Sequence, residues 1–212
     1  MTLDTPKFLS SWWQRGEFLL AMIIIHVLDH LVSDNLTKSG VLNEWGNELV
    51  AAFEHVGGIA LALLAVACLV AIIKPFQRVI VPLMAVYLSF AVVHLVVNVV
   101  AVLLTAEIRR GQALINLWDV VVVYSMGVFI FAAWYWFLDK ITPGGAFLFP
   151  LKPGEESART LLDYLFLSFN TSSTFGPTTE PPTTRPAKVL MMMQVCSSLV
   201  VLMVLLARAI SG

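Results

Sequence analysis

Five long apolar runs alternate with short polar stretches along the chain. An apolar run of about 20 residues is long enough to cross the hydrocarbon layer of a bilayer as one helix. The five runs cover residues 17–35, 50–73, 79–105, 117–138 and 188–210. The pattern therefore predicts an all-α integral membrane protein with five transmembrane helices.

The stretch between the fourth and fifth runs follows a different pattern. A short amphipathic segment, Asp163–Asn170, leads into a Ser- and Thr-rich turn that contains Gly176 and Pro177. This segment is too short to cross a bilayer, and non-helical backbone is tolerated at membrane depth only where protein buries it or a water-filled cavity receives it. The sequence therefore predicts a re-entrant pore helix and loop between the last two transmembrane helices.

The chain divides into two parts near residue 110. Residues 1–110 are predicted to form an interfacial segment and then a three-helix membrane module. The paired tryptophans of Phe8–Arg15 suit a short helix that lies at the membrane surface. Residues 111–212 are predicted to form a pore-like module of outer helix, re-entrant loop and inner helix.

Composition supports a membrane protein and narrows the classes of function. Hydrophobic residues make up 58% of the 212 residues and charged residues only 13%, whereas about 25% of a soluble domain is charged. The net charge of −1 gives no reason to expect a nucleic-acid partner. We recognise no nucleophile–base pair, Gly-rich phosphate loop or redox pair of cysteines, so we do not expect an enzyme.

The residues FNTSSTFGPTTEPP, from Phe169 to Pro182, resemble the pore signature of two-transmembrane-helix potassium channels. In that signature an aromatic-rich pore helix leads into a Thr-Val-Gly-Tyr-Gly-Asp filter, and an apolar inner helix follows. Laid on this pattern, the filter positions fall in order on Thr174, Phe175, Gly176, Pro177, Thr178 and Thr179. The stretch also looks like a group of bacterial membrane proteins that carry Phe-Ser/Gly-Pro-Thr in a potassium-channel-like filter.

The resemblance implies an assembly and a location. It implies a homotetramer around the re-entrant segment, in the inner membrane of a bacterial cell. It would place the re-entrant loop and the N-terminus outside the cell. The match is strongest over Leu162–Ile210, and the first three spans have no counterpart in the family.

Two departures from the family pattern change the expected selectivity. A potassium filter lines up backbone carbonyls that replace the hydration shell of the ion, and its backbone relies on Gly where φ is positive. Pro177 fixes φ near −65°, and the β-branched Thr178 resists positive φ. We therefore expect a hydroxyl-lined filter that selects cations weakly, or a re-entrant segment that packs without conducting.

The predicted pore lining combines the re-entrant segment with three residues of the inner helix. The re-entrant part comprises Thr171, Ser172, Ser173, Thr174, Phe175, Gly176, Pro177, Thr178, Thr179 and Glu180. The inner-helix part comprises Gln194, Ser197 and Ser198.

A second candidate site lies in the first three spans, which contain all four His residues of the chain. Ionisable residues inside a membrane are costly and are candidates for function. Helical rise places these side chains at similar depths. The set comprises His26, Asp29, His30, Glu54, His55 and His94.

Three interpretations of this His and acid cluster remain open. It can be a polar network that joins helices, a site that senses or relays protons, or a site for zinc or another divalent metal. No cofactor is certain. The sequence as a whole predicts a tetrameric, channel-like protein whose partners are the bilayer and ions, with this cluster modulating it by pH or metal. The alternative is a non-conducting membrane metalloprotein, or a transporter of protons or small solutes.

Overall fold

The structure, a computed structural model, describes residues 12–38, 44–70, 77–105, 113–150, 159–174 and 180–211. These residues form six α-helices, and no strand occurs among them. The helices are α1 (Trp12–Lys38), α2 (Glu44–Val70), α3 (Gln77–Thr105), α4 (Ala113–Ile141), α5 (Leu161–Thr174) and α6 (Arg185–Ser211). The all-α prediction is confirmed for the described part of the chain.

Five of the helices are long and apolar enough to cross a membrane, and they coincide with the five predicted spans. The exception is α5, which has 14 residues. One boundary differs from the prediction, because Trp12–Arg15 form the first turn of α1 and not a separate surface helix. The remainder of the predicted surface helix, residues 8–11, lies outside the described residues.

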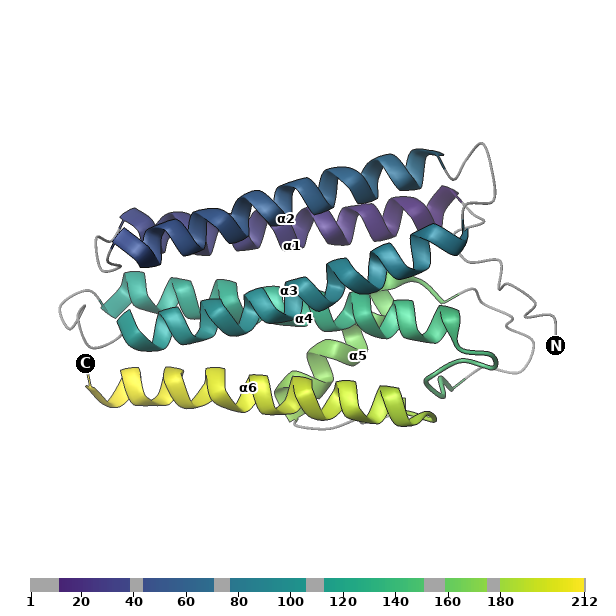
Figure 1. Cartoon of the computed structure of the whole chain (residues 1–212). Helices are drawn as coiled ribbons and strands as arrows, with labels where there is room; N and C mark the ends of the chain where they lie inside the picture. Colours follow the sequence, from purple (N-terminus) through teal and green to yellow (C-terminus); the bar gives the residue numbers. More distant parts are fainter. Residues whose placement is uncertain are drawn as a thin grey trace.

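The five long helices run lengthwise and form the bundle, while α5 crosses obliquely between α4 and α6 (Figure 1). The end of α4 and the beginnings of α5 and α6 lie at the same end of the bundle. From there α5 runs towards the middle of α6. Helix α5 thus begins near the end of the bundle where α6 begins, and it ends beside the middle of α6.

Helix α4 is the centre of the bundle. About 67% of the apolar stretch that could cross a membrane is buried inside the protein in α4, compared with 17% in α2. Helix α4 packs against α1, α3, α5 and α6. Large aromatic side chains fill the space around its last turns, where Trp136 stacks on Phe18 with ring centroids 5.5 Å apart. Tyr135 meets Phe147 edge to face at 4.9 Å.

The turn that leads from α4 towards α5 is built around the buried carboxylate of Asp139. One carboxylate oxygen accepts hydrogen bonds from the backbone N–H groups of Ala146 (2.6 Å) and Phe147 (3.0 Å). The other accepts from Arg159 (2.9 Å) and from the hydroxyl of Tyr164 (2.6 Å). A buried carboxylate is stable only when it is paired and hydrogen-bonded, and here the same bonds fix the start of α5.

Glycine makes this turn possible. Gly144 and Gly145 have φ values of 80° and 85°, which residues with a Cβ atom rarely adopt. A Cβ atom on Gly145 would also lie 3.0 Å from an oxygen of Asp139. The glycines therefore let the backbone approach the carboxylate closely enough to donate to it.

The segments that flank α5 pair with each other. Phe147 and Pro182 form an isolated antiparallel bridge. The N–H of Leu148 donates to Pro181 (3.1 Å), and the N–H of Thr183 donates to Ala146 (2.9 Å). The chain that follows α4 and the chain that precedes α6 are thereby joined at one end of the bundle.

We expect Asp139→Ala to destabilise the protein strongly. The change leaves Arg159 and three further donors without their buried acceptor, a loss worth about 3–5 kcal/mol. Denaturant titration of the purified protein in mild detergent measures the free energy of unfolding. Asp163→Ala is the control, because Asp163 only caps the exposed start of α5 through Thr160, and its loss costs about 1 kcal/mol. Equal losses in the two variants would contradict the central role of Asp139.

Candidate functional site

The side-chain amide of Gln194, on α6, joins three helices. Its nitrogen donates to the hydroxyls of Ser168 and Ser172 on α5, each at 2.7 Å, and to the backbone carbonyl of Ser168 at 2.8 Å. Its oxygen accepts a hydrogen bond from the hydroxyl of Tyr135 on α4. Ser168 in turn donates to the carbonyl of Val128 on α4 at 2.8 Å. All four side chains are buried, so this Gln194 network ties α4, α5 and α6 together.

The Gln194 network also sets the depth of α5 in the bundle. Gln194 lies nine residues after the first residue of α6, which corresponds to about 13 Å along the helix axis. Ser172 and Thr174, at the end of α5, are therefore held well inside the span of α6. The backbone must return from Thr174 to Arg185, and residues 175–179 of that return lie outside the described residues.

The structure divides the predicted pore residues into three groups. Thr171 and Ser172 are buried within the single chain, where Thr171 donates to the carbonyl of Leu167 (2.8 Å). Ser173 is exposed, and Glu180 is buried with one carboxylate oxygen that has no hydrogen-bond partner among the described residues. Phe175, Gly176, Pro177, Thr178 and Thr179 lie outside the described residues, as does the side chain of Thr174.

The three inner-helix residues do not share one open face of the chain. Gln194 and Ser198 are buried, whereas Ser197 is partly exposed and donates to the carbonyl of Met193 on its own helix at 2.9 Å. Gln194 points towards α5, and a pore-lining role of these three residues stays a prediction. The outward face of α6 is apolar and contains Val189, Met192, Met193, Leu199, Leu202, Met203 and Leu206.

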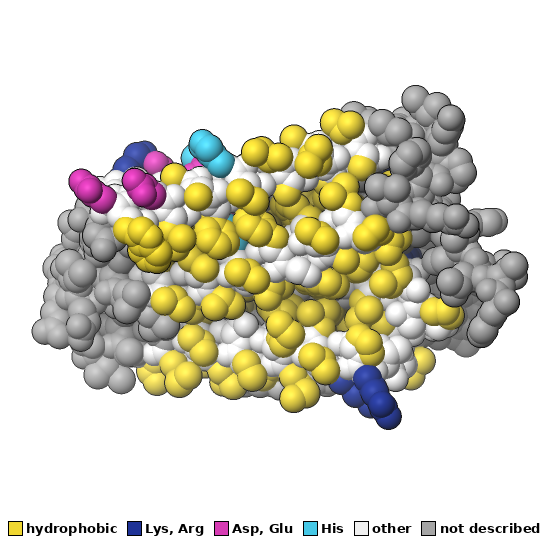
Figure 2. Space-filling view, in the orientation of Figure 1, with side chains coloured by type: hydrophobic (Ala, Val, Ile, Leu, Met, Phe, Trp, Pro, Cys, Tyr) yellow, Lys and Arg dark blue, Asp and Glu magenta, His cyan; other side chains and the backbone are white. Residues whose placement is uncertain are grey.

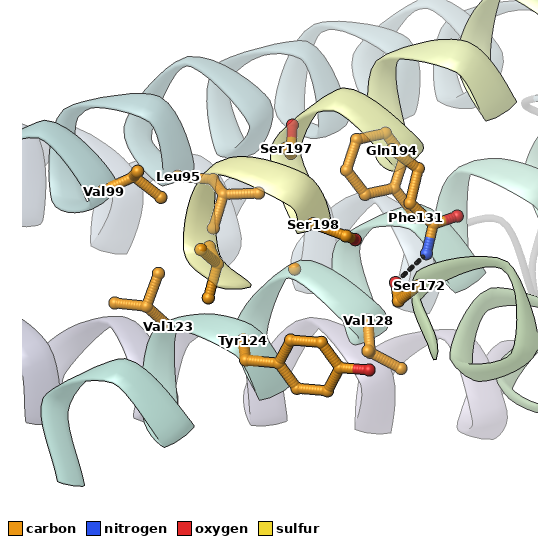
Figure 3. A pocket seen from close by; sticks show the side chains of 12 residues that line it. Leu95, Val99, Val123, Tyr124, Val128, Phe131, Ser172, Gln194, Ser197 and Ser198 are labelled. Carbon is orange, nitrogen blue, oxygen red and sulfur yellow. Dashed lines mark hydrogen bonds between the residues drawn. The ribbon is translucent and has the colours of Figure 1, made fainter. Parts of the chain in front are cut away.

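A small cavity lies beside the Gln194 network, between α3, α4, α5 and α6 (Figure 3). Its volume is about 20 Å³, which exceeds the roughly 10–15 Å³ that one water molecule needs. Ser172, Gln194, Ser197 and Ser198 give it a polar side, and valine, leucine and aromatic side chains form the rest. The dashed line in Figure 3 marks the bond from Gln194 to Ser172.

Four of the six residues in the predicted His and acid cluster form two pairs. Inside the bundle, the carboxylate of Asp29 on α1 pairs with Nδ1 of His94 on α3 at 3.1 Å and accepts from Asn98 at 2.9 Å. All three residues are buried. The ring of Phe53 on α2 lies 5.0 Å from that of His94. This pair therefore joins α1 to α3, with α2 packed over it.

The other members of the cluster lie nearer the surface. Nδ1 of His30 is 2.5 Å from a carboxylate oxygen of Glu54, and the two side chains are 60% and 30% exposed. His55 is exposed, and His26 lies partly buried against Gly58. Within the described residues, no three His, Cys, Asp or Glu side chains converge as metal ligands. Metal binding, proton binding and a purely structural role at these residues stay predictions.

Sequence reasoning missed several residues that position the site. It assigned no role to Ser168 or Asp139, although both supply polar contacts that hold α5. Ser168 and Ser172 are four residues apart, and this spacing places both on one face of a helix. That spacing was the available signal that α5 presents a polar face to a neighbour.

Comparisons with known proteins do not assign the chain to a family. No protein-family model matches the chain, and neither a curated protein nor a solved structure matches it.

We expect Gln194→Leu to loosen α5 from α6. The hydroxyls of Tyr135, Ser168 and Ser172 lose a shared buried partner, and unsatisfied buried groups cost about 1–3 kcal/mol each. Hydrogen–deuterium exchange should become faster in the second half of α5. Ser197→Ala is the control, because Ser197 bonds only within α6. Unchanged exchange in Gln194→Leu would show that packing alone holds α5.

The two His–acid pairs should differ in their contributions to stability. Asp29→Ala leaves His94 and Asn98 without a buried acceptor, and breaking a buried pair costs about 3–5 kcal/mol. Glu54→Ala removes an exposed pair, which contributes about 0–1 kcal/mol. Thermal unfolding in detergent compares the variants, and a larger loss for Glu54→Ala would contradict the assignment.

Proposed function

We propose that the chain is one subunit of a channel-like homotetramer that passes cations with weak selectivity through the segment Thr171–Thr179. The observation that carries the proposal is the placement of α5, whose last residues are held by Gln194 inside the bundle. A helix of 14 residues is about 21 Å long and cannot cross a hydrocarbon layer of about 30 Å. Non-helical backbone that follows a helix end at such a depth must be surrounded by protein or by a water-filled cavity.

The direction of α5 favours cations. The C-terminal end of a helix carries a partial negative charge, because its last carbonyl groups have no partner within the helix. In α5 this is the end that lies deepest, beside the Thr-rich segment. Hydroxyl oxygens, the helix end and the carboxylate of Glu180 would all attract cations and repel anions.

The contacts at both ends of α5 would hold the segment that follows it in a fixed position. Asp139 fixes the beginning of the helix through Tyr164 and Arg159, and Gln194 fixes the second half. The pairing between residues 146–148 and 181–183 fixes the point where the chain leaves the loop. Weak selectivity then follows from the loop residues themselves, because Pro177 and Thr178 disfavour the ladder of backbone carbonyls that a potassium filter needs.

Ion flux into liposomes that contain the purified protein tests the proposal. We expect comparable fluxes of potassium and sodium and far less chloride. Thr174→Trp should abolish the flux, because a bulky side chain at the end of α5 would fill the lining. Val86→Trp is the matched control, because Val86 is an exposed residue of α3 far from α5 in the sequence.

The assembly is tested separately by native mass spectrometry in detergent. A tetramer is expected, and a protein that stays monomeric in detergent and in nanodiscs would contradict the pore. If no ion crosses the liposome membrane while the tetramer is intact, the re-entrant segment only packs. The alternative of a proton or solute transporter, or a metalloprotein, would then be favoured.

A further inference from the structure

A groove of about 620 Å³ lies on the surface between α3 and α6, with α4 behind it. That volume is within the 300–1,000 Å³ that is usual for small-molecule sites. The groove exists because α3 and α6 both pack on α4 and hardly touch each other. Its walls are Ser89, Val92, Val93, Trp134, Leu138, Arg185, Pro186, Val189, Leu190 and Met193.

The groove is apolar along its length and basic at one end. Arg185 is the first residue of α6, and Met193 lies eight residues further along, or about 12 Å deeper. The hydroxyl of Ser89 is already bonded to the carbonyl of Ala85 at 2.7 Å. Figure 2 shows hydrophobic side chains across this face of the bundle, with basic side chains beside the start of α6.

Arg185 has no partner that explains its position. It is exposed, and no ion pair or hydrogen bond links its side chain to a residue that the structure describes. It stands where the apolar span of α6 begins, which is the level at which a bilayer presents its phosphate groups. A guanidinium group binds phosphate oxygens through a planar pair of N–H donors.

We propose that this groove binds one acyl chain of an anionic phospholipid, whose phosphate group is held by Arg185. The chemistry of the groove matches both parts of such a molecule, because the long apolar groove ends at Arg185, whose side chain has no partner among the described residues. A protein segment would leave the guanidinium group without a phosphate, and a soluble anion would not need the apolar length. The site involves α3 and does not depend on conduction by the proposed pore.

Native mass spectrometry of the full-length protein in detergent, with phosphatidylglycerol or phosphatidylcholine added, tests the proposal. We expect at least one phosphatidylglycerol molecule to be retained per subunit, more tightly than phosphatidylcholine. Arg185→Gln should weaken the binding of phosphatidylglycerol about tenfold, since it removes a charge-assisted bond. Val189→Trp should weaken the binding of both lipids, because the indole ring fills the groove.

Two matched variants separate the groove from general attraction to lipid. Lys188→Gln removes the other basic residue of the first turn of α6, and Met192→Trp adds an indole ring on an exposed position of α6. Neither Lys188 nor Met192 lines the groove, so both variants should bind phosphatidylglycerol like the unchanged protein. If all four variants bind alike, the proposal is wrong.

A second measurement tests whether another copy of the chain occupies the groove. Val189→Cys is made in a background in which Cys68 and Cys196 are replaced by Ser, and the protein is oxidised in native membranes. Efficient disulfide formation between copies at this position would place protein over the groove and overturn the proposal. Absence of the disulfide, together with the lipid result above, would support it.

Discussion

Polar groups inside an apolar bundle must find their partners within the protein, because no bulk water reaches them. The arrangement of this chain follows from that constraint. Asp139, Gln194 and Asp29 each sit in the buried part of the bundle, and each is bonded to side chains from at least one other helix. The bonds of Asp29 join the long helices α1 and α3. The position of the short helix α5 depends on the bonds of Asp139 and Gln194.

The two polar centres around α5 act at different levels of the bundle. Asp139 lies at the end of α4 and orders the backbone of the turn through Ala146 and Phe147. Gln194 lies deeper and bonds Ser168 and Ser172 within helix α5 rather than the backbone of a turn. Because both centres are anchored on α4 or bonded to it, the most buried helix of the bundle positions α5, the shortest of the described helices. The candidate site is therefore supported from one side by a rigid core.

The number and placement of the long helices could be predicted from the sequence, because hydrophobic length alone determines which segments can span a bilayer. The contacts between helices could not be predicted from the sequence. Residue number gives the depth of a side chain along a helix, but its direction around the helix axis depends on the neighbouring helices. Depth placed the His and acid residues at similar levels, but it could not show that His30 pairs with Glu54 near the surface while Asp29 pairs with His94 inside the bundle. The same ambiguity hid the contact between Gln194, a polar residue on an apolar helix, and the serines of α5.

The bridge between Phe147 and Pro182 has a consequence for the order in which the chain is assembled. It closes a loop of about 35 residues that contains all of α5, and closing a loop carries an entropy cost that contacts within it must offset. Before α4 and α6 stand side by side, neither the bridge nor the bonds from Gln194 to α5 can form. Helices α4 and α6 can enter a bilayer independently as stable spans, whereas α5 cannot. We therefore expect the long helices to insert first and the docking of α5 to complete the fold.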